Sequence, residues 1–163
     1  MIKWLAVALL FGVALAADLS PYLPDNSKTP GLLDPVLTKE LICRPEFRTG
    51  KYRDVDDDTK DTVCQAYGLP PHCNAKQAFE IDHLCAIYIG GSQSTANLWP
   101  QTCSGEWNCH VKDKLEVYLH EQLCSGKIAS PQEACDCLRN DWIACYKRYF
   151  DKPVPLGGKL HVQ

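Results

Sequence analysis

Apolar residues recur at helical spacing in the last third of the chain. The positions are Val111, Leu115, Tyr118, Leu119 and Leu123. Steps of three and four residues along this set place all of them on one face of an amphipathic helix. We expect the helix to end near Cys124, because Gly126 follows where helices commonly stop.

A second helix is predicted to begin directly afterwards. The segment Ser130-Pro131-Gln132-Glu133 has the form of a capping box, with proline at the first helical position. Apolar residues then continue through Leu138, Trp142, Cys145 and Tyr149. Earlier in the chain, Asp58 to Tyr67 predicts a shorter helix closed by Gly68, and Thr38 to Cys43 predicts one helical turn.

The middle of the chain has a pattern that favours strands instead. Phe79, Ile81, Ile87 and Ile89 alternate or lie in a β-rich run, with a break at Gly90-Gly91-Ser92. This predicts a strand, a turn and a second strand, followed by a short extended piece at residues 97–100. Strands in the middle followed by two longer helices indicate a small α+β fold.

The first residues read as a leader that is removed. Lys3 provides a positive charge, residues 4–13 an apolar run, and Ala14-Leu15-Ala16 a cleavage site. We therefore predict a signal peptide at residues 1–16 and a secreted, extracellular protein. The apolar run is short for a hydrocarbon layer of about 30 Å, so no membrane anchor is expected.

The remaining chain is long enough for one domain. Removing 16 of 163 residues leaves 147, and losing Lys3 changes the formal charge from −3 to −4. A hydrophobic content of 45% argues against disorder. The proline-rich residues 17–36 predict an extended arm, residues 37–151 the folded domain, and residues 152–163 a flexible tail.

Ten cysteines, all beyond the leader, form an even set in a protein expected to be secreted. Disulfides are therefore the default, with a structural zinc site as the alternative. Five bridges among ten cysteines can be paired in about 945 ways, so spacing alone leaves the pairing open.

The residues with the clearest chemistry are Asp82 and His83, at the end of the first predicted strand. A carboxylate offers a hard oxygen ligand to a divalent ion, and a histidine can take a proton from water. One ion and one base suffice for phosphodiester hydrolysis. Neighbouring strand residues face opposite sides, so both can serve one site only where the strand ends or bends.

Four motifs in order give this pair its context: Asp82-His83-Leu84, Gly90-Gly91-Ser92, Asn97-Leu98-Trp99-Pro100 and Lys112-Asp113-x-Leu115-Glu116. Together they resemble the HNH-type (ββα-metal, His-Me finger) endonucleases, in their secreted or bacterial members. The resemblance extends over about residues 29–150. It implies a small ββα-metal nuclease core with additional helices, stabilised by disulfides.

The resemblance also implies a role for each matching residue. His83 corresponds to the general base, and Asp82 to a ligand of one divalent ion, Mg²⁺ or Mn²⁺. Asn97 corresponds to the residue that holds the loop and orients the histidine. Asn108 matches a second metal ligand, with His110 as the alternative for that position.

Lys112 is expected on the same grounds to contact a substrate phosphate, although a solvated helix face is an equal alternative. Cys43 and Cys124 align with two cysteines of the family and are expected to pair, and Cys85 is expected to form a bridge behind the site. The chain departs from the family at Ala86 and Tyr88, where members usually have proline and an acidic residue.

These expectations describe a monomeric endonuclease that cuts DNA, and RNA as a second substrate, with little sequence specificity. The acidic charge stands against a nucleic-acid partner, although basic residues gather at positions 44–53 and 147–152. One alternative is a catalytically impaired, nuclease-like binding protein such as a toxin or effector, which Tyr88 favours. A purely structural disulfide-rich protein is the third interpretation.

Overall fold

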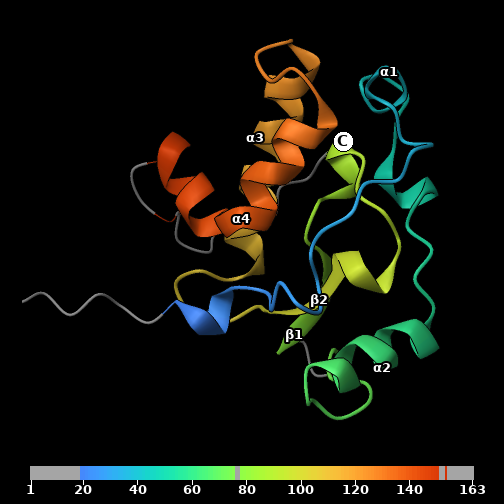
Figure 1. Cartoon of the computed structure of the whole chain (residues 1–163), viewed down its shortest axis with the longest axis vertical. Helices are drawn as coiled ribbons and strands as arrows, with labels where there is room; N and C mark the ends of the chain where they lie inside the picture. The colour runs from blue at the N-terminus through green and yellow to red at the C-terminus, as the bar shows by residue number, and fades with distance from the viewer. Residues whose placement is uncertain (1–18, 76–77, 151–152, 154–163) are drawn as a thin grey trace, which may run out of the picture.

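The computed structural model describes residues 19–75, 78–150 and 153. The predicted signal peptide, residues 1–16, and the predicted tail apart from residue 153 lie outside these residues. Within them the chain combines four α-helices with one two-stranded antiparallel sheet, which agrees with the predicted α+β class (Figure 1).

The helices and strands follow one another in a simple order. The α-helices are α1 (Lys39–Ile42), α2 (Asp57–Ala66), α3 (Cys109–Cys124) and α4 (Pro131–Tyr149). The strands are β1 (Phe79–His83) and β2 (Leu98–Thr102). The described residues also form four 3₁₀ turns: η1 (Ser20–Tyr22), η2 (Thr49–Lys51), η3 (Ile87–Ile89) and η4 (Thr95–Asn97).

Side-chain caps set where α2 and α4 begin. Asp56 accepts a hydrogen bond from the amide of Thr59, so α2 starts one residue before its predicted position. Ser130 accepts from the amide of Glu133, and α4 starts at Pro131 as predicted.

Helix α4 has an interruption that the apolar spacing did not predict. Asp141 has φ −171° and ψ 100°, and its carboxylate accepts from the amide of Ala144 at 2.9 Å. Asp141 therefore acts as an internal N-cap that starts a second helical half. The disulfide between Cys137 and Cys145 spans this kink.

The prediction of a second strand at residues 87–89 is wrong. Ile87 and Ile89 lie in η3, and the partner of β1 is β2, with Asp82 opposite Trp99 and His83 opposite Leu98. Both isoleucines are buried in the core. A short apolar run that is buried all round shows no period that separates a strand from a turn.

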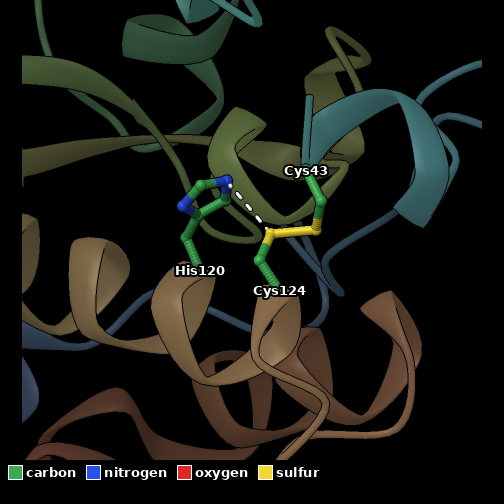
Figure 2. A group of neighbouring side chains, drawn as sticks. All are labelled: Cys43, His120 and Cys124. Carbon is green, nitrogen blue, oxygen red and sulfur yellow. Dashed lines mark hydrogen bonds between the residues drawn. A yellow bond between two sulfur atoms is a disulfide. The ribbon is translucent and has the colours of Figure 1, made fainter. Parts of the chain in front are cut away.

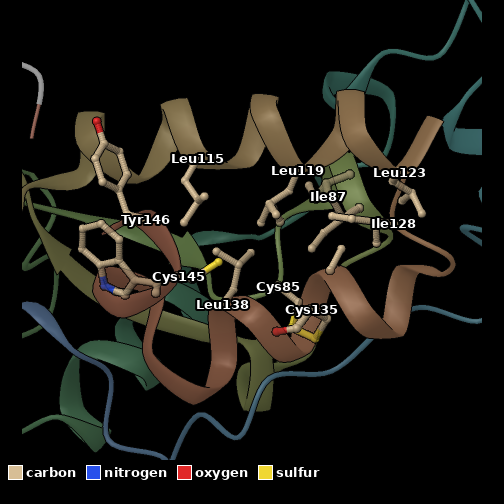
Figure 3. Close-up of a cluster of buried hydrophobic side chains, with 14 of the residues drawn as sticks. Cys85, Ile87, Leu115, Leu119, Leu123, Ile128, Cys135, Leu138, Cys145 and Tyr146 are labelled. Atoms are coloured by element: carbon tan, nitrogen blue, oxygen red, sulfur yellow. A yellow bond between two sulfur atoms is a disulfide. The ribbon is translucent and has the colours of Figure 1, made fainter. Parts of the chain in front are cut away.

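The hydrophobic core lies mainly between α3, α4 and the loop around η3 (Figure 3). Leu115, Leu119 and Leu123 on α3 are completely buried, as the predicted apolar face requires. Figure 3 shows them in a row facing Leu138 on α4 and Ile87 in the loop. This packing holds the loop that connects β1 to β2.

All ten cysteines are paired, and the pairs are Cys43–Cys124, Cys64–Cys73, Cys85–Cys135, Cys103–Cys109 and Cys137–Cys145. The predicted pairing of Cys43 with Cys124 is confirmed. Cys85 is bridged to α4, directly behind the loop that follows β1. A structural zinc site has no free thiolate to use, and the five bridges are typical of an oxidising compartment.

The segment before α1 runs across the sheet and the helices. Its backbone accepts a hydrogen bond from the Trp142 indole at Tyr22, 2.8 Å, and Thr29 donates its hydroxyl to the carbonyl of Leu98, 2.8 Å. Among the described residues, the helices fall short of the length and apolar character needed to cross a bilayer.

Candidate active site

Asp82 and His83 stand side by side at the end of β1 and point to different neighbours. Asp82 accepts a hydrogen bond from Lys112 on α3, whereas the imidazole of His83 meets Gln93 in the loop before β2. This divergence follows from the alternation of side chains along a strand. The site therefore has a carboxylate side and a histidine side.

The histidine side has a defined tautomer. Gln93 donates from Nε2 to the carbonyl of Tyr52, 2.6 Å, and accepts at Oε1 from the amide of Asp54, 3.3 Å, which fixes its orientation. Because Oε1 is an acceptor, Nε2 of His83, 3.1 Å away, carries the hydrogen. Nδ1 is consequently the ring atom with a lone pair that can accept a proton.

His83 is only 3% exposed, and this burial lowers the pKa of its imidazole. The nearby charge of Asp82 and the bond to Gln93 act in the opposite direction without cancelling the effect. The lower pKa keeps the imidazole neutral at neutral pH, because the neutral form predominates above the pKa. A neutral, oriented imidazole is the form that acts as a general base.

Asn97 is fully buried, and its side chain holds the loop between the strands closed. Its Nδ2 donates to the carbonyls of Cys85 and Ser92, and its Oδ1 accepts from the amides of Cys85 and Leu32. The amide of Leu84 bonds to the carbonyl of Asn97 itself. These bonds fix the chain directly after His83, in line with the predicted loop-holding role.

Lys112 lies at the centre of the carboxylate side and is completely buried. Its ammonium donates to Asp82, 2.6 Å, to the carbonyl of His83, 2.9 Å, and to Glu116. A side chain enclosed in this way has no access to a substrate phosphate. Contrary to the prediction of a phosphate contact, Lys112 joins α3 to the end of β1.

The acidic residue expected at position 88 is not needed to hold this lysine. Tyr88 instead packs edge-on against His120, with ring centroids 4.8 Å apart. Asp82 and Glu116 supply the counter-charges for Lys112, and they raise its pKa although burial alone would lower it. The departure at Tyr88 therefore leaves the Lys112 network complete.

Four carboxylates surround this single ammonium: Glu80, Asp82, Asp113 and Glu116. Burial, followed by the charges of Asp82 and Asp113, raises the pKa of Glu80 to about 7. Burial and Asp82 likewise raise the pKa of Asp113, and burial raises that of Glu116 to about 8. The cluster holds more negative charge than Lys112 neutralises, which suits a divalent cation.

Asn108 and His110, the two other predicted ligands, are placed differently from Asp82. Asn108 is the N-cap of α3, accepting from the amide of His110, 3.0 Å, and donating to the carbonyl of Gly105, 2.7 Å. The imidazole of His110 is 58% exposed, and its Nδ1 lies 3.5 Å from a carboxylate oxygen of Asp113. His110 also lines, with Glu80, an open hollow of about 520 Å³.

Two further residues on β2 belong to the carboxylate side, and the motif-based prediction missed them as site residues. Trp99 and Gln101 lie opposite Asp82 and Glu80 in the sheet, on the same face. The Trp99 indole N–H and both amide atoms of Gln101, which is 1% exposed, have no hydrogen-bond partner among the described residues. Strand alternation at residues 98–102 is the signal that could have found them.

These unpartnered atoms bear on whether the site fits a divalent ion. Buried polar groups are normally satisfied, so the unpaired atoms beside the carboxylate cluster call for a partner such as water or an ion. Asp82 can offer Oδ1, because Lys112 uses Oδ2, and Gln101 can offer an amide oxygen. Oxygen ligands of this kind suit Mg²⁺ or Mn²⁺.

Two other groups of potential ligands in the described part of the chain do not qualify as metal centres. They are Cys43, His120 and Cys124, and Glu80, Cys103 and Cys109. Figure 2 shows His120 beside the Cys43–Cys124 disulfide, with Nε2 3.5 Å from the sulfur of Cys124. In both groups the cysteines are bonded to each other, so they offer no thiolate.

Comparison with known proteins returned no family model, curated protein or solved structure that matches this chain. The chain is thus defined by its own features: a disulfide-bonded α+β fold with a buried histidine next to a carboxylate cluster.

Proposed function

We propose that this protein is a secreted, metal-dependent endonuclease of the HNH (ββα-metal) type. The observation that carries the proposal is the oriented, neutral His83 at the end of β1, adjacent to the Asp82 carboxylate. The order of β1, loop, β2 and α3 supports it, because α3 supplies the lysine that holds the strand end.

His83 acts as the general base in this proposal. Gln93 holds the Nε2–H, so Nδ1 accepts a proton from the attacking water. Asn97 keeps the following loop rigid, which fixes the direction of the imidazole. A base held in this way needs little reorganisation when the proton moves.

Asp82 is the principal candidate ligand for one Mg²⁺ or Mn²⁺ ion, with Glu80 and Gln101 as neighbouring oxygen donors. Asn108 and His110 are secondary candidates, since Asn108 caps its own helix and His110 lies at the exposed edge. When bound, such an ion polarises the scissile phosphate and stabilises charge on the leaving oxygen.

The main alternative to the nuclease proposal is an impaired, nuclease-like binding protein. Its main support was the missing acidic residue at Tyr88, which was expected to position the lysine. That support is removed, because Lys112 is held by Asp82, Glu116 and a backbone carbonyl. DNA as first substrate, RNA as second, and a monomeric state remain parts of the proposal.

The proposal is tested by incubating the purified, oxidised protein with supercoiled plasmid and with a structureless RNA. Mg²⁺ and Mn²⁺ are supplied separately, and EDTA is added to parallel reactions. We expect nicked and linear plasmid with either ion and none with EDTA. Intact DNA and RNA under every metal condition would refute the nuclease and favour the binding protein.

A further inference from the structure

A basic, aromatic surface lies next to the histidine side of the site. It consists of residues 44–53, which we call the basic segment, and its cations are Arg44, Arg48, Lys51 and Arg53. All four are exposed, and no ion pair with another described residue is formed by any of them. Unpaired cations at one place in a chain of net charge −3 call for an anionic ligand.

Hydrogen bonds through Gln93 connect this segment to His83. The carbonyl of Tyr52 and the amide of Asp54 both bond to Gln93, and Gln93 bonds to the imidazole. Arg53 is close enough for its charge to act on both His83 and Glu80. A ligand bound along the segment therefore lies next to the residue that holds the imidazole of His83.

The segment is also shaped as a platform rather than a loose loop. Phe47 and Tyr52 stack with ring centroids 5.1 Å apart and an interplanar angle of 22°. They line a hollow of about 150 Å³ together with three cations and one carboxylate: Arg44, Arg48, Lys51 and Glu46. The Cys43–Cys124 bridge anchors the segment where it begins.

Cations and aromatic rings that line one hollow are the combination that binds the phosphates and bases of nucleic acid. We propose that the basic segment is the substrate-binding surface that directs a nucleic-acid strand to His83. The inference rests on the proposed nuclease function, and it resolves the charge conflict, because an acidic chain binds a polyanion through a local basic surface.

The test uses a double variant, Arg44→Gln with Lys51→Gln, which leaves Arg48 and its bonds to backbone carbonyls intact. The control, Lys28→Gln with Arg139→Gln, makes the same charge change outside the basic segment and outside the second group of basic residues at positions 147–152. Binding of a fluorescein-labelled single-stranded oligonucleotide is followed by anisotropy in EDTA over a range of salt concentrations. Cleavage with Mg²⁺ is measured separately.

We expect the double variant to bind about tenfold more weakly. The slope of log K against log salt concentration should decrease in magnitude by about 1.4, or about 0.7 per lost phosphate contact. The control should keep the slope of the unmodified protein. If the double variant binds weakly and none of the proteins cleaves, the proposal of a binding surface stands and the proposal of a nuclease is refuted.

Three outcomes would overturn the inference itself. The first is a double variant that binds with unchanged affinity and slope. The second is a control that weakens binding as much as the double variant, since the effect would then reflect total charge. The third is an unmodified protein that binds no oligonucleotide. Circular dichroism of each variant confirms that the fold is retained.

Discussion

Replacing Lys112 with methionine is the most informative perturbation of the carboxylate side. Methionine is close to lysine in size but removes the ammonium that bonds to Asp82, Glu116 and the carbonyl of His83. The lysine is fully buried, and the side chains of its two acidic partners are only 10% and 13% exposed. The substitution therefore leaves Asp82 without its counter-charge and Glu116 without its hydrogen-bond donor.

The expected loss can be set from this geometry. Removing one partner of a buried ion pair costs about 3–5 kcal/mol, because the remaining charge is desolvated without compensation. For a domain of this size about 1 kcal/mol corresponds to roughly 2–4 °C, so Tm should fall by about 6–20 °C.

Guanidinium and thermal unfolding of the disulfide-intact proteins measure this loss. Lys114→Met is the matched control, because Lys114 lies on the same helix but is only partly buried, and it should stay within about 0.5 kcal/mol of the unmodified protein. A loss below about 1 kcal/mol for Lys112→Met would refute the argument that Lys112 holds the strand end.

Two further perturbations address the loop. Gly91→Ala should prevent stable folding, since a Cβ there would overlap the carbonyl of Cys85, whereas Gly50→Ala, with open space around it, should fold normally; yield and melting temperature compare them. Gln93→Leu should lower kcat about 10-fold or more with little change in KM, because it frees the imidazole of His83 to rotate. Gln93→Glu keeps an acceptor for Nε2 of His83 and should retain more activity. Equal losses of kcat in both variants would show that the hydrogen bond from Nε2 to residue 93 does not control activity.

Local signals were sufficient for several parts of the fold. The apolar spacing from Val111 onward predicted α3, because one face of that helix is buried against the core. The capping box predicted the start of α4. The Cys43–Cys124 pair followed from the resemblance to a family rather than from spacing, and the structure has it.

Other features depend on tertiary contacts that no local pattern encodes. Lys112 was expected at the surface, since a charged residue in a helix is usually solvated, and only its three partners make burial favourable. Gln93 gave no signal, because its role depends on Tyr52, forty-one residues earlier in the chain. The kink at Asp141 required knowing that an aspartate could cap the second half of α4.

The central claim is that His83 is the general base of a metal-dependent nuclease. It is tested most directly by the rate of plasmid cleavage with Mg²⁺ by His83→Ala, compared with the unmodified protein. His120→Gln is the control, since glutamine can keep the bond to the carbonyl of Ile42. We expect His83→Ala to be slower by about 10²–10⁴-fold and the control to be unchanged. Equal cleavage rates for His83→Ala and the unmodified protein would contradict the claim.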